Sequence, residues 1–306
     1  MVVALDATRF VVGMSFLALA AASDVRTRRV ANRVWVAMGS VGLVVLAVQI
    51  AAEGDPPAMY LALIPAAALF FTVFYGRELR DDRGWHFAIG PVASYVAGAA
   101  AAIAGWSWLS DDADARLRFL AFLSAAAMML VFRLFYQVHL LKGGADAKAL
   151  MAVALLVPTY PALPGLPLVG LDPRLGPAIS LAFPFAFLVL LNAALLSVLV
   201  PLGLLAYNAS RGHAKFPEGL FGVKVPLDAI PKFAWLMDRI VDGEHVVYLM
   251  PRGEGDRTED LQALHAAGFR EVWVTPQIPF VVAIAIGYIV SFVVGNVLVG
   301  AFQAFA

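Results

Sequence analysis

The most informative stretch of the chain is residues 141–148, which read Leu141-Lys142-Gly143-Gly144-Ala145-Asp146-Ala147-Lys148. Two glycines and a carboxylate stand here directly before an apolar run that extends to Val157. A charged side chain in a membrane segment costs about 2.5–3.5 kcal/mol on insertion scales, so a carboxylate in this position suggests a functional site. The alternative is that Asp146 only caps the following helix, while Lys142 and Lys148 anchor it at the membrane surface.

The composition is that of a membrane protein. Of the 306 residues, 61% are hydrophobic and 14% are charged, whereas soluble domains have about 25% charged residues. The 22 basic and 22 acidic residues balance, so net charge gives no indication of a nucleic-acid partner, and we expect none. The chain has no cysteine, which excludes disulfide bonds and thiol catalysis.

The apolar runs predict an α-helical polytopic membrane protein with about eight membrane segments. These are residues 3–22, 34–52, 58–75, 85–109, 117–138, 147–157, 178–207 and 278–304. The sixth is too short to cross a bilayer upright, so it is either extended by the preceding motif or partly re-entrant, with its backbone shielded by protein. The first lacks a basic n-region, and we expect it to be retained, with its charged start (Asp6, Arg9) at the outer interface.

The longest polar stretch is residues 207–277. Within it, His245–Met250 and Glu271–Thr275 resemble strands and Thr258–Ala267 a helix, which predicts a small cytosolic α/β insertion before the last helix, either a subdomain or a βαβ fragment. Its simpler interpretation is a cap on the helices, and the alternative is a lid or a substrate-docking element. The chain would then comprise a membrane core with both aspartates (1–206), the insertion (207–277) and the last transmembrane helix (278–306).

A second carboxylate, Asp24, ends the first apolar run and precedes a basic segment, Val25-Arg26-Thr27-Arg28-Arg29-Val30-Ala31-Asn32-Arg33. With the N-terminus outside, eight crossings place residues 23–33 and 139–148 on the cytosolic side. Residues 76–84 and 207–277 fall on the same side. Only four of the 22 Lys and Arg residues lie toward the other side, Arg9, Arg116, Arg118 and Arg174, as the positive-inside rule requires. Asp24 and Asp146 are therefore expected on the same face of the membrane.

The order of these motifs resembles a known family. An Asp that ends the first membrane helix, followed by basic residues and Asn32, and then a distant Gly-Gly-Ala-Asp-Ala-Lys, is similar to the archaeal prepilin and preflagellin peptidases, which are GxGD-type intramembrane aspartyl proteases. More loosely, residues 272–280 resemble the start of that family's last helix. The resemblance implies an aspartic endopeptidase that removes class III signal peptides from prepilins or pre-archaellins at the cytosolic membrane face, with Asp24 and Asp146 as catalytic residues. Its partners would be those substrates and the lipid bilayer.

The chain departs from the family's pattern in two places. Ala145 stands where G-x-G-D has its second glycine, although the archaeal branch resembles this form. In addition, Asp146 follows Asp24 by 122 positions, a longer separation than in compact six-helix members, as though two extra helices lay between them. The lack of cysteines argues against the bacterial form with a tetracysteine zinc site.

Two neighbouring carboxylates can hydrolyse a peptide bond without a metal. One activates water as a general base, while the other is protonated and polarises the carbonyl group. Because like charges repel, the pair holds one proton and titrates as a unit. Helix dipoles favour negative charge on Asp146, near an N-terminal helix end, and disfavour it on Asp24, near a C-terminal end, which predicts Asp146 as the ionised base. Gly143 and Gly144 would let a substrate backbone approach closely.

The supporting residues carry weaker predictions. Asn32 either contacts the substrate strand, braces the basic turn, or caps the second helix. Lys148 belongs to the motif, but on a helix it points away from Asp146, so we do not expect it to tune that carboxylate. Family substrates carry a basic stretch that could meet acidic residues of one loop, although solvation explains these equally well: Glu78, Asp81 and Asp82. The five histidines show no ligand spacing, so we expect no metal and no cofactor.

Two other functions are compatible with the sequence. A presenilin-like protease would carry a tyrosine before its first aspartate, where this chain has Ser23. A proton- or cation-coupled secondary transporter would also use paired membrane acids and a broken helix. Carboxylates that face one cytosolic cleft favour the protease, and carboxylates near the bilayer midplane favour the transporter.

Overall fold

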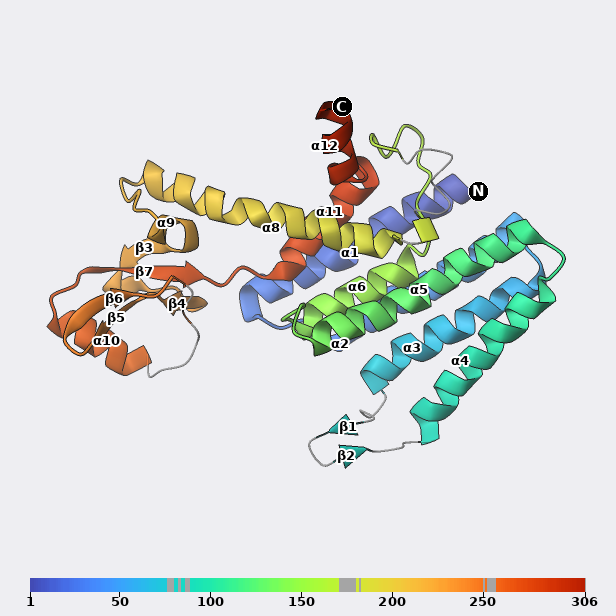
Figure 1. Cartoon of the computed structure of the whole chain (residues 1–306), viewed down its shortest axis with the longest axis horizontal. Helices are drawn as coiled ribbons and strands as arrows, with labels where there is room; N and C mark the ends of the chain where they lie inside the picture. Colours follow the sequence, from blue (N-terminus) through green and yellow to red (C-terminus); the bar gives the residue numbers. More distant parts are fainter. Residues whose placement is uncertain are drawn as a thin grey trace. The chain divides into compact units, whose positions relative to one another are not determined.

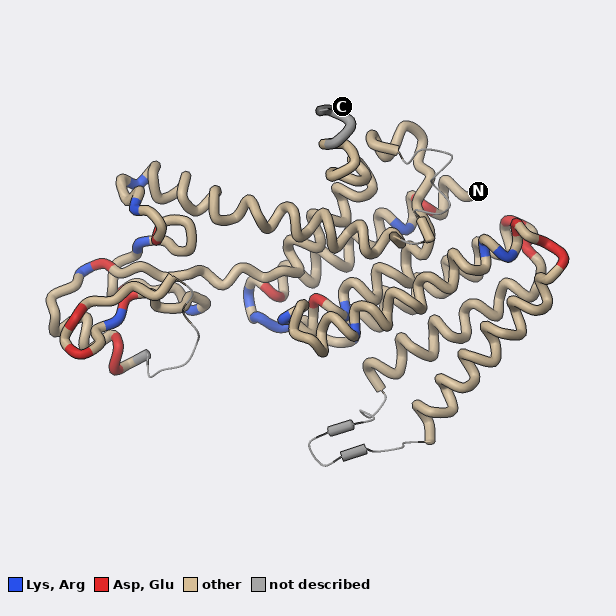
Figure 2. Tube along the Cα trace, in the orientation of Figure 1, with Lys and Arg blue, Asp and Glu red and all other residues tan. Residues whose placement is uncertain are grey.

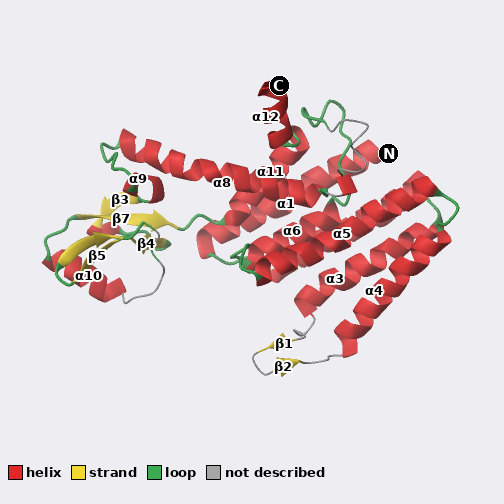
Figure 3. Ribbon diagram, viewed as in Figure 1, coloured by secondary structure: helices red, strands yellow, loops and turns green. Residues whose placement is uncertain are grey.

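A computed structural model of the chain describes residues 1–75, 80–81, 84–85, 89–170, 180–181, 183–249, 251 and 257–305. The chain forms two compact units, one of Met1–Ala194 with Pro279–Ala306 and the other of Leu195–Ile278. The first unit is built from helices, and the second combines short strands with helices (Figure 1, Figure 3).

Six helical segments among the described residues are long and apolar enough to cross a membrane. They are α1 (Val2–Thr27), α2 (Asn32–Glu53), the 3-10 helix η1 (Pro57–Ala62) continued by α3 (Leu63–Tyr75), α4 (Ile89–Trp108), α5 (Ala113–Gln137) and α8 (Phe185–Ser210). The chain is therefore a multi-pass helical membrane protein, as predicted. Helices α4 and α8 begin later than expected, and residues 86–88 and 171–179, just before them, lie outside the described ranges.

A short helix, α6 (Gly144–Leu156), occupies the middle of the first unit, where it contacts α1, α2, α5 and α11 (Figure 1). All residues from Ala149 to Val157 are buried. A helix that is apolar on every side is typically enclosed by protein. Helix α2 can approach α6 closely because Gly42 has no side chain: a Cβ there would lie 2.7 Å from the backbone nitrogen of Leu156. Because lipid is as apolar as these side chains, such tight contacts hold membrane helices together.

The last apolar segment, predicted as one helix over 278–304, is interrupted. Helix α11 (Phe280–Val293) ends before Gly295, which has φ +90°, and α12 (Val297–Phe305) follows. The break allows the chain near Val169 to pair with it, because the backbone N–H groups of Leu168 and Val169 donate to the carbonyls of Val293 (2.9 Å) and Val294 (2.8 Å). The prediction of an unbroken last helix is therefore wrong.

The second unit contains the predicted α/β region. A three-stranded antiparallel sheet has the order β3 (Val223–Pro226), β7 (Glu271–Pro276), β4 (Ala234–Leu236), and β5 (Asp238–Val241) forms a hairpin with β6 (Glu244–Val247). Three short helices complete it: α9 (Glu218–Phe221), η2 (Leu227–Ala229) and α10 (Arg257–Ala266). Its core is formed by Leu227, Ala234, Leu236, Leu264, Val272 and Val274.

The βαβ alternative for this region is wrong. The two predicted strands correspond to β6 and β7, which belong to different sheets, and every pairing in the unit is antiparallel. The partners of β7 are strands of four and three residues, too short to show an alternating pattern.

One further hairpin, β1 (Arg80–Asp81) with β2 (Gly84–Trp85), lies between α3 and α4 in the chain and is described only by its backbone.

Candidate active site

The two predicted catalytic aspartates lie at helix ends, as expected. Asp24 is three residues before the end of α1, whose last turn closes with an N–H···O bond of 2.8 Å from Arg28 to the Asp24 carbonyl. Asp146 lies in the first turn of α6, after the N-cap residue Gly143. Helices α1 and α6 contact each other, and the charge of Asp24 acts on the Asp146 carboxyl group. The two carboxylates are therefore within electrostatic reach of one another.

Asp146 is buried, with 9% of its surface exposed, and its helix is not among the six candidate spans. The pKa of Asp146 is raised to about 7, chiefly by burial and in addition by the negative charge of Asp24, while a backbone hydrogen bond from Gly143 opposes both. The N-terminal end of α6 favours the ionised form, but burial acts more strongly in the opposite direction. The raised pKa of Asp146 therefore argues against the prediction that Asp146 is the ionised base at rest.

Gly143 provides space for this carboxylate. Its backbone is extended, with φ −97° and ψ 124°, which any residue can adopt. A Cβ at this position, however, would overlap the side-chain oxygen of Asp146. A Cβ on Gly144 would meet only the Tyr136 hydroxyl group, at 3.5 Å. Of the two glycines, Gly143 is thus the one that the carboxylate requires, while Ala145 beside it is partly buried against the core.

Two of the supporting residues meet directly. The Lys148 ammonium group donates a 3.0 Å hydrogen bond to the Asn32 side-chain oxygen and lies 5.6 Å from the centre of the Phe74 ring. Asn32 does not cap α2, because the N-cap position is Ala31 and no side chain bonds there. The capping interpretation of Asn32 is therefore wrong, and the Asn32–Lys148 pair instead joins the start of α2 to α6. Figure 2 shows Lys and Arg gathered where α1 leads into α2 and where α5 leads into α6.

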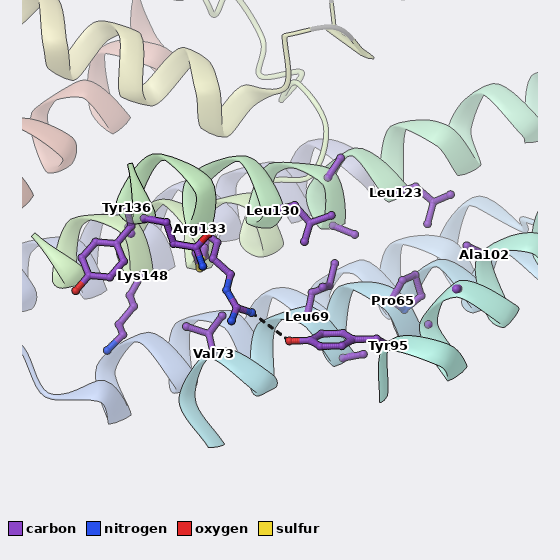
Figure 4. Close-up of a pocket in the computed structure, with 18 of the residues that line it drawn as sticks. Pro65, Leu69, Val73, Tyr95, Ala102, Leu123, Leu130, Arg133, Tyr136 and Lys148 are labelled. Carbon is purple, nitrogen blue, oxygen red and sulfur yellow. Dashed lines mark hydrogen bonds between the residues drawn. The ribbon is translucent and has the colours of Figure 1, made fainter. Parts of the chain in front are cut away.

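A groove of about 1210 Å³ lies between α3, α4, α5 and α6 (Figure 4). In Figure 4, Arg133, Tyr136 and Lys148 gather at one end and Leu123 lies toward the other, and Arg133 donates a 3.1 Å hydrogen bond to the Tyr95 hydroxyl.

This groove is not centred on the aspartates. Helix α6 lines it with one face, formed by Gly144, Ala147, Lys148 and Met151. Asp146 follows Gly144 by two positions, which is about 200° around an α-helix. The groove and the Asp146 carboxylate therefore lie on opposite faces of α6, and the helix ends, rather than this groove, define the candidate active site.

No other candidate centre emerges from the described part of the chain. No group of three or more metal-ligating side chains is found in it. The acidic loop residues Glu78, Asp81 and Asp82, proposed as substrate contacts, have side chains outside the described ranges.

Sequence reasoning missed one polar cluster. Asp6 and Arg9, expected at an exposed outer interface, are buried and bonded to each other. Their spacing of three residues on one helix face, among apolar neighbours, was the signal that could have identified them.

Comparison with known proteins gives matches to two family models. Residues 11–110 match the type IV leader peptidase family, and residues 214–297 match the archaeal peptidase A24 C-terminus type II. Asp24 and Asn32 fall within the first range, and Asp146 lies between the two ranges. The preflagellin peptidase of Methanocaldococcus jannaschii is 28% identical over 177 residues, 55% of this chain and 69% of the relative. That of Methanococcus voltae is 29% identical over 182 residues, 56% of this chain and 72% of the relative.

The two family models agree on one class of enzyme, and together they match more than half of the chain. The transporter interpretation has no comparable support. The observed helical membrane fold and the small α/β region toward the C-terminus agree with this assignment. The chain therefore belongs to the type IV leader peptidase family, the A24 peptidases, as an aspartic prepilin-type membrane peptidase of the archaeal form.

Proposed function

We propose that Asp24 and Asp146 form the catalytic pair of an endopeptidase that removes class III signal peptides from prepilins or pre-archaellins. One observation carries the proposal: Asp24, near the C-terminal end of α1, is within electrostatic reach of the buried Asp146 carboxyl group in the first turn of α6. The relatives are preflagellin peptidases, which supports a pilin-like substrate with a basic leader and an apolar segment. We place the reaction at the cytosolic membrane face, where the positive-inside rule puts both aspartates.

The protonation of the pair suggests a division of roles. Because the pKa of Asp146 is raised to about 7, we assign Asp146 as the partner that holds the shared proton and Asp24 as the base. Asp24 takes a proton from water as the hydroxyl group attacks the peptide carbon, and Asp146 donates its proton to the carbonyl oxygen. As the C–N bond breaks, Asp24 passes its proton to the leaving amine and Asp146 recovers its own from the hydroxyl group. Both carboxyl groups end as they began.

Gly143 has a place in this scheme. A peptide bond can be attacked only when the substrate backbone is extended and close to both acids. The chain before α6 is not helical, and Gly143 has an extended backbone without a side chain. A substrate strand can therefore pass beside Gly143 while the Asp146 carboxylate stays folded against it.

The test is cleavage of a pilin precursor by the detergent-solubilised protein. We expect Asp24→Asn and Asp146→Asn each to lose at least about 10³-fold in rate, because either change removes a proton-transfer group. Asp111→Asn, at an exposed turn, is the matched control and should cleave like the parent. Melting temperatures establish that the variants are folded. Cleavage that survives in either folded variant overturns the catalytic pair.

A further inference from the structure

Arg9 is the most completely buried charged residue described in the first unit, with 1% of its surface exposed. Its guanidinium group makes three hydrogen bonds. The Nε atom donates to the Leu156 carbonyl at 2.9 Å, Nη1 to the Asp6 carboxylate at 2.9 Å, and Nη2 to the Gln49 side-chain oxygen at 2.5 Å. A charge removed from water is tolerated only when it is paired and hydrogen-bonded in this way.

The partners of Arg9 belong to several elements. The second oxygen of Asp6 accepts a 2.9 Å bond from the backbone N–H of Ala162, and the Tyr288 hydroxyl of α11 donates to the Arg9 carbonyl at 2.7 Å. Gln49 is held in turn by a 2.8 Å bond to Glu53. The Arg9 cluster, defined as Asp6, Arg9 and Gln49, thus ties α1 to α2, to the end of α6 and to α11.

The bond to Leu156 is the informative one, because Leu156 is the last residue of α6. The final carbonyl groups of a helix have no partner within it, and a cation stabilises them. Arg9 therefore caps the C-terminal end of the helix whose first turn carries Asp146. Arg9 itself belongs to the helix that carries Asp24. The two helices with the aspartates are joined by a polar tie at the ends opposite to those acids.

We propose that Arg9 is a positioning residue that fixes how far α1 is shifted along its axis against α6, and so sets the separation of Asp24 from Asp146. The catalytic part of this inference rests on the proposed function. A helix behaves as a rod, so a shift at Arg9 reappears at Asp24, fifteen residues or about 22 Å farther along. Apolar contacts between membrane helices tolerate sliding more readily than a set of directed hydrogen bonds does.

The alternative role for Arg9 is stability alone. To separate the two roles, the variant Asp6→Asn with Arg9→Met removes both charges together, so that no unpaired ion stays buried. The matched control is Asp55→Asn with Arg118→Met. It neutralises an ion pair of 2.8 Å that links the turn after α2 to α5 without touching α1 or α6.

The experiment measures kcat and KM for a pilin precursor, together with the distance between spin labels at Val25→Cys and Lys142→Cys, two exposed positions. The chain has no native cysteine to interfere. We expect the Asp6→Asn/Arg9→Met variant to lose about 10- to 100-fold in kcat with KM unchanged, and to show a shifted or broadened label distance. The control variant should match the parent in both measurements.

Parent-like kcat in the folded variant overturns the inference, as does an unchanged label distance. If the double variant does not fold, Arg9→Lys takes its place. It keeps the charge beside Asp6 but cannot make all three hydrogen bonds of the guanidinium group, and kcat and the label distance are measured for it in the same way. Failure of the proposed function is seen separately, as cleavage that survives in Asp24→Asn or Asp146→Asn. The label distance tests the register of α1 and α6 in either case.

Discussion

Gly143 and Gly144 are adjacent in the motif but differ in what surrounds them. A methyl group on Gly143 would overlap the Asp146 carboxylate, whereas one on Gly144 has an ordinary contact with Tyr136 at 3.5 Å. We expect Gly143→Ala to lower kcat for precursor cleavage at least about tenfold, because a displacement of about 1 Å at a catalytic group can cost 10²-fold. Initial rates at saturating substrate measure this effect.

Gly144→Ala is the control for this prediction, since it makes the same chemical change one residue away. It should retain most of the activity of the parent. If the two alanine variants lose activity equally, the glycines act through backbone flexibility, and the steric explanation for Gly143 is wrong.

The raised pKa of Asp146 also makes stability depend on pH. An aspartate in the unfolded chain has a pKa near 3.9, whereas the pKa of Asp146 in the fold is about 7. Between these values the folded state binds more protons than the unfolded state, so stability falls as pH rises from about 4 to 7. Asp146→Asn cannot ionise. It should therefore melt at a higher temperature than the parent at pH 8, and the difference should disappear toward pH 4.

Thermal unfolding in detergent at several pH values measures this difference. The exposed Asp111→Asn serves as the reference, because its effect on melting should not change across the same range. If the difference in melting temperature between Asp146→Asn and the parent is constant from pH 4 to pH 8, burial does not raise the pKa of Asp146 and the explanation is wrong.

Among the single elements, α6 shows which structural features could be predicted from the sequence and which could not. The apolar run and its prolines identified the helix and its short length from the sequence. Its surroundings could not be predicted, because most of the helices that enclose α6, such as α1, α2 and α11, are distant from it in the chain. The same reason explains the break between α11 and α12, since the backbone groups that pair there come from Leu168 and Val169.

Whether the role of a polar residue could be predicted also depends on whether its partners are near it in the sequence. Asp24 and Asp146 could be identified because each interrupts an apolar run beside a recognisable motif. The spacing of Arg9 from Asp6 could have signalled their pairing, but the role of Arg9 could not be predicted, because it depends on Gln49 and Leu156, whose proximity is a property of the packed bundle. The charge state of Asp146 was predicted from the helix end alone, because the helix end is visible in the sequence, whereas the burial that raises the pKa of Asp146 is not.

For the whole molecule, the number of membrane crossings depends on α6. Helices α1 to α5 provide five of the six candidate spans, and α8 is the sixth. If α6 does not cross, residues 142 and 244 lie on opposite sides of the membrane, and if it does, they lie on the same side. With 13 residues, α6 is about 20 Å long, which is less than the bilayer core of about 30 Å.

The contacts of α6 nevertheless favour a crossing by its apolar part, which begins after Asp146. Its first turn lies near Asp24 and its last carbonyl is bound by Arg9, so α6 runs between two levels of α1 that are about 22 Å apart. We expect Glu244→Cys to react with a membrane-impermeant maleimide from the same side as Lys142→Cys, the cytosolic side, and Asp111→Cys to react only from the other. Intact cells and inverted vesicles distinguish the two sides, and the cysteine-free parent is the control. Labelling of Glu244→Cys together with Asp111→Cys would mean that α6 enters and leaves the membrane on one side, which is the re-entrant alternative.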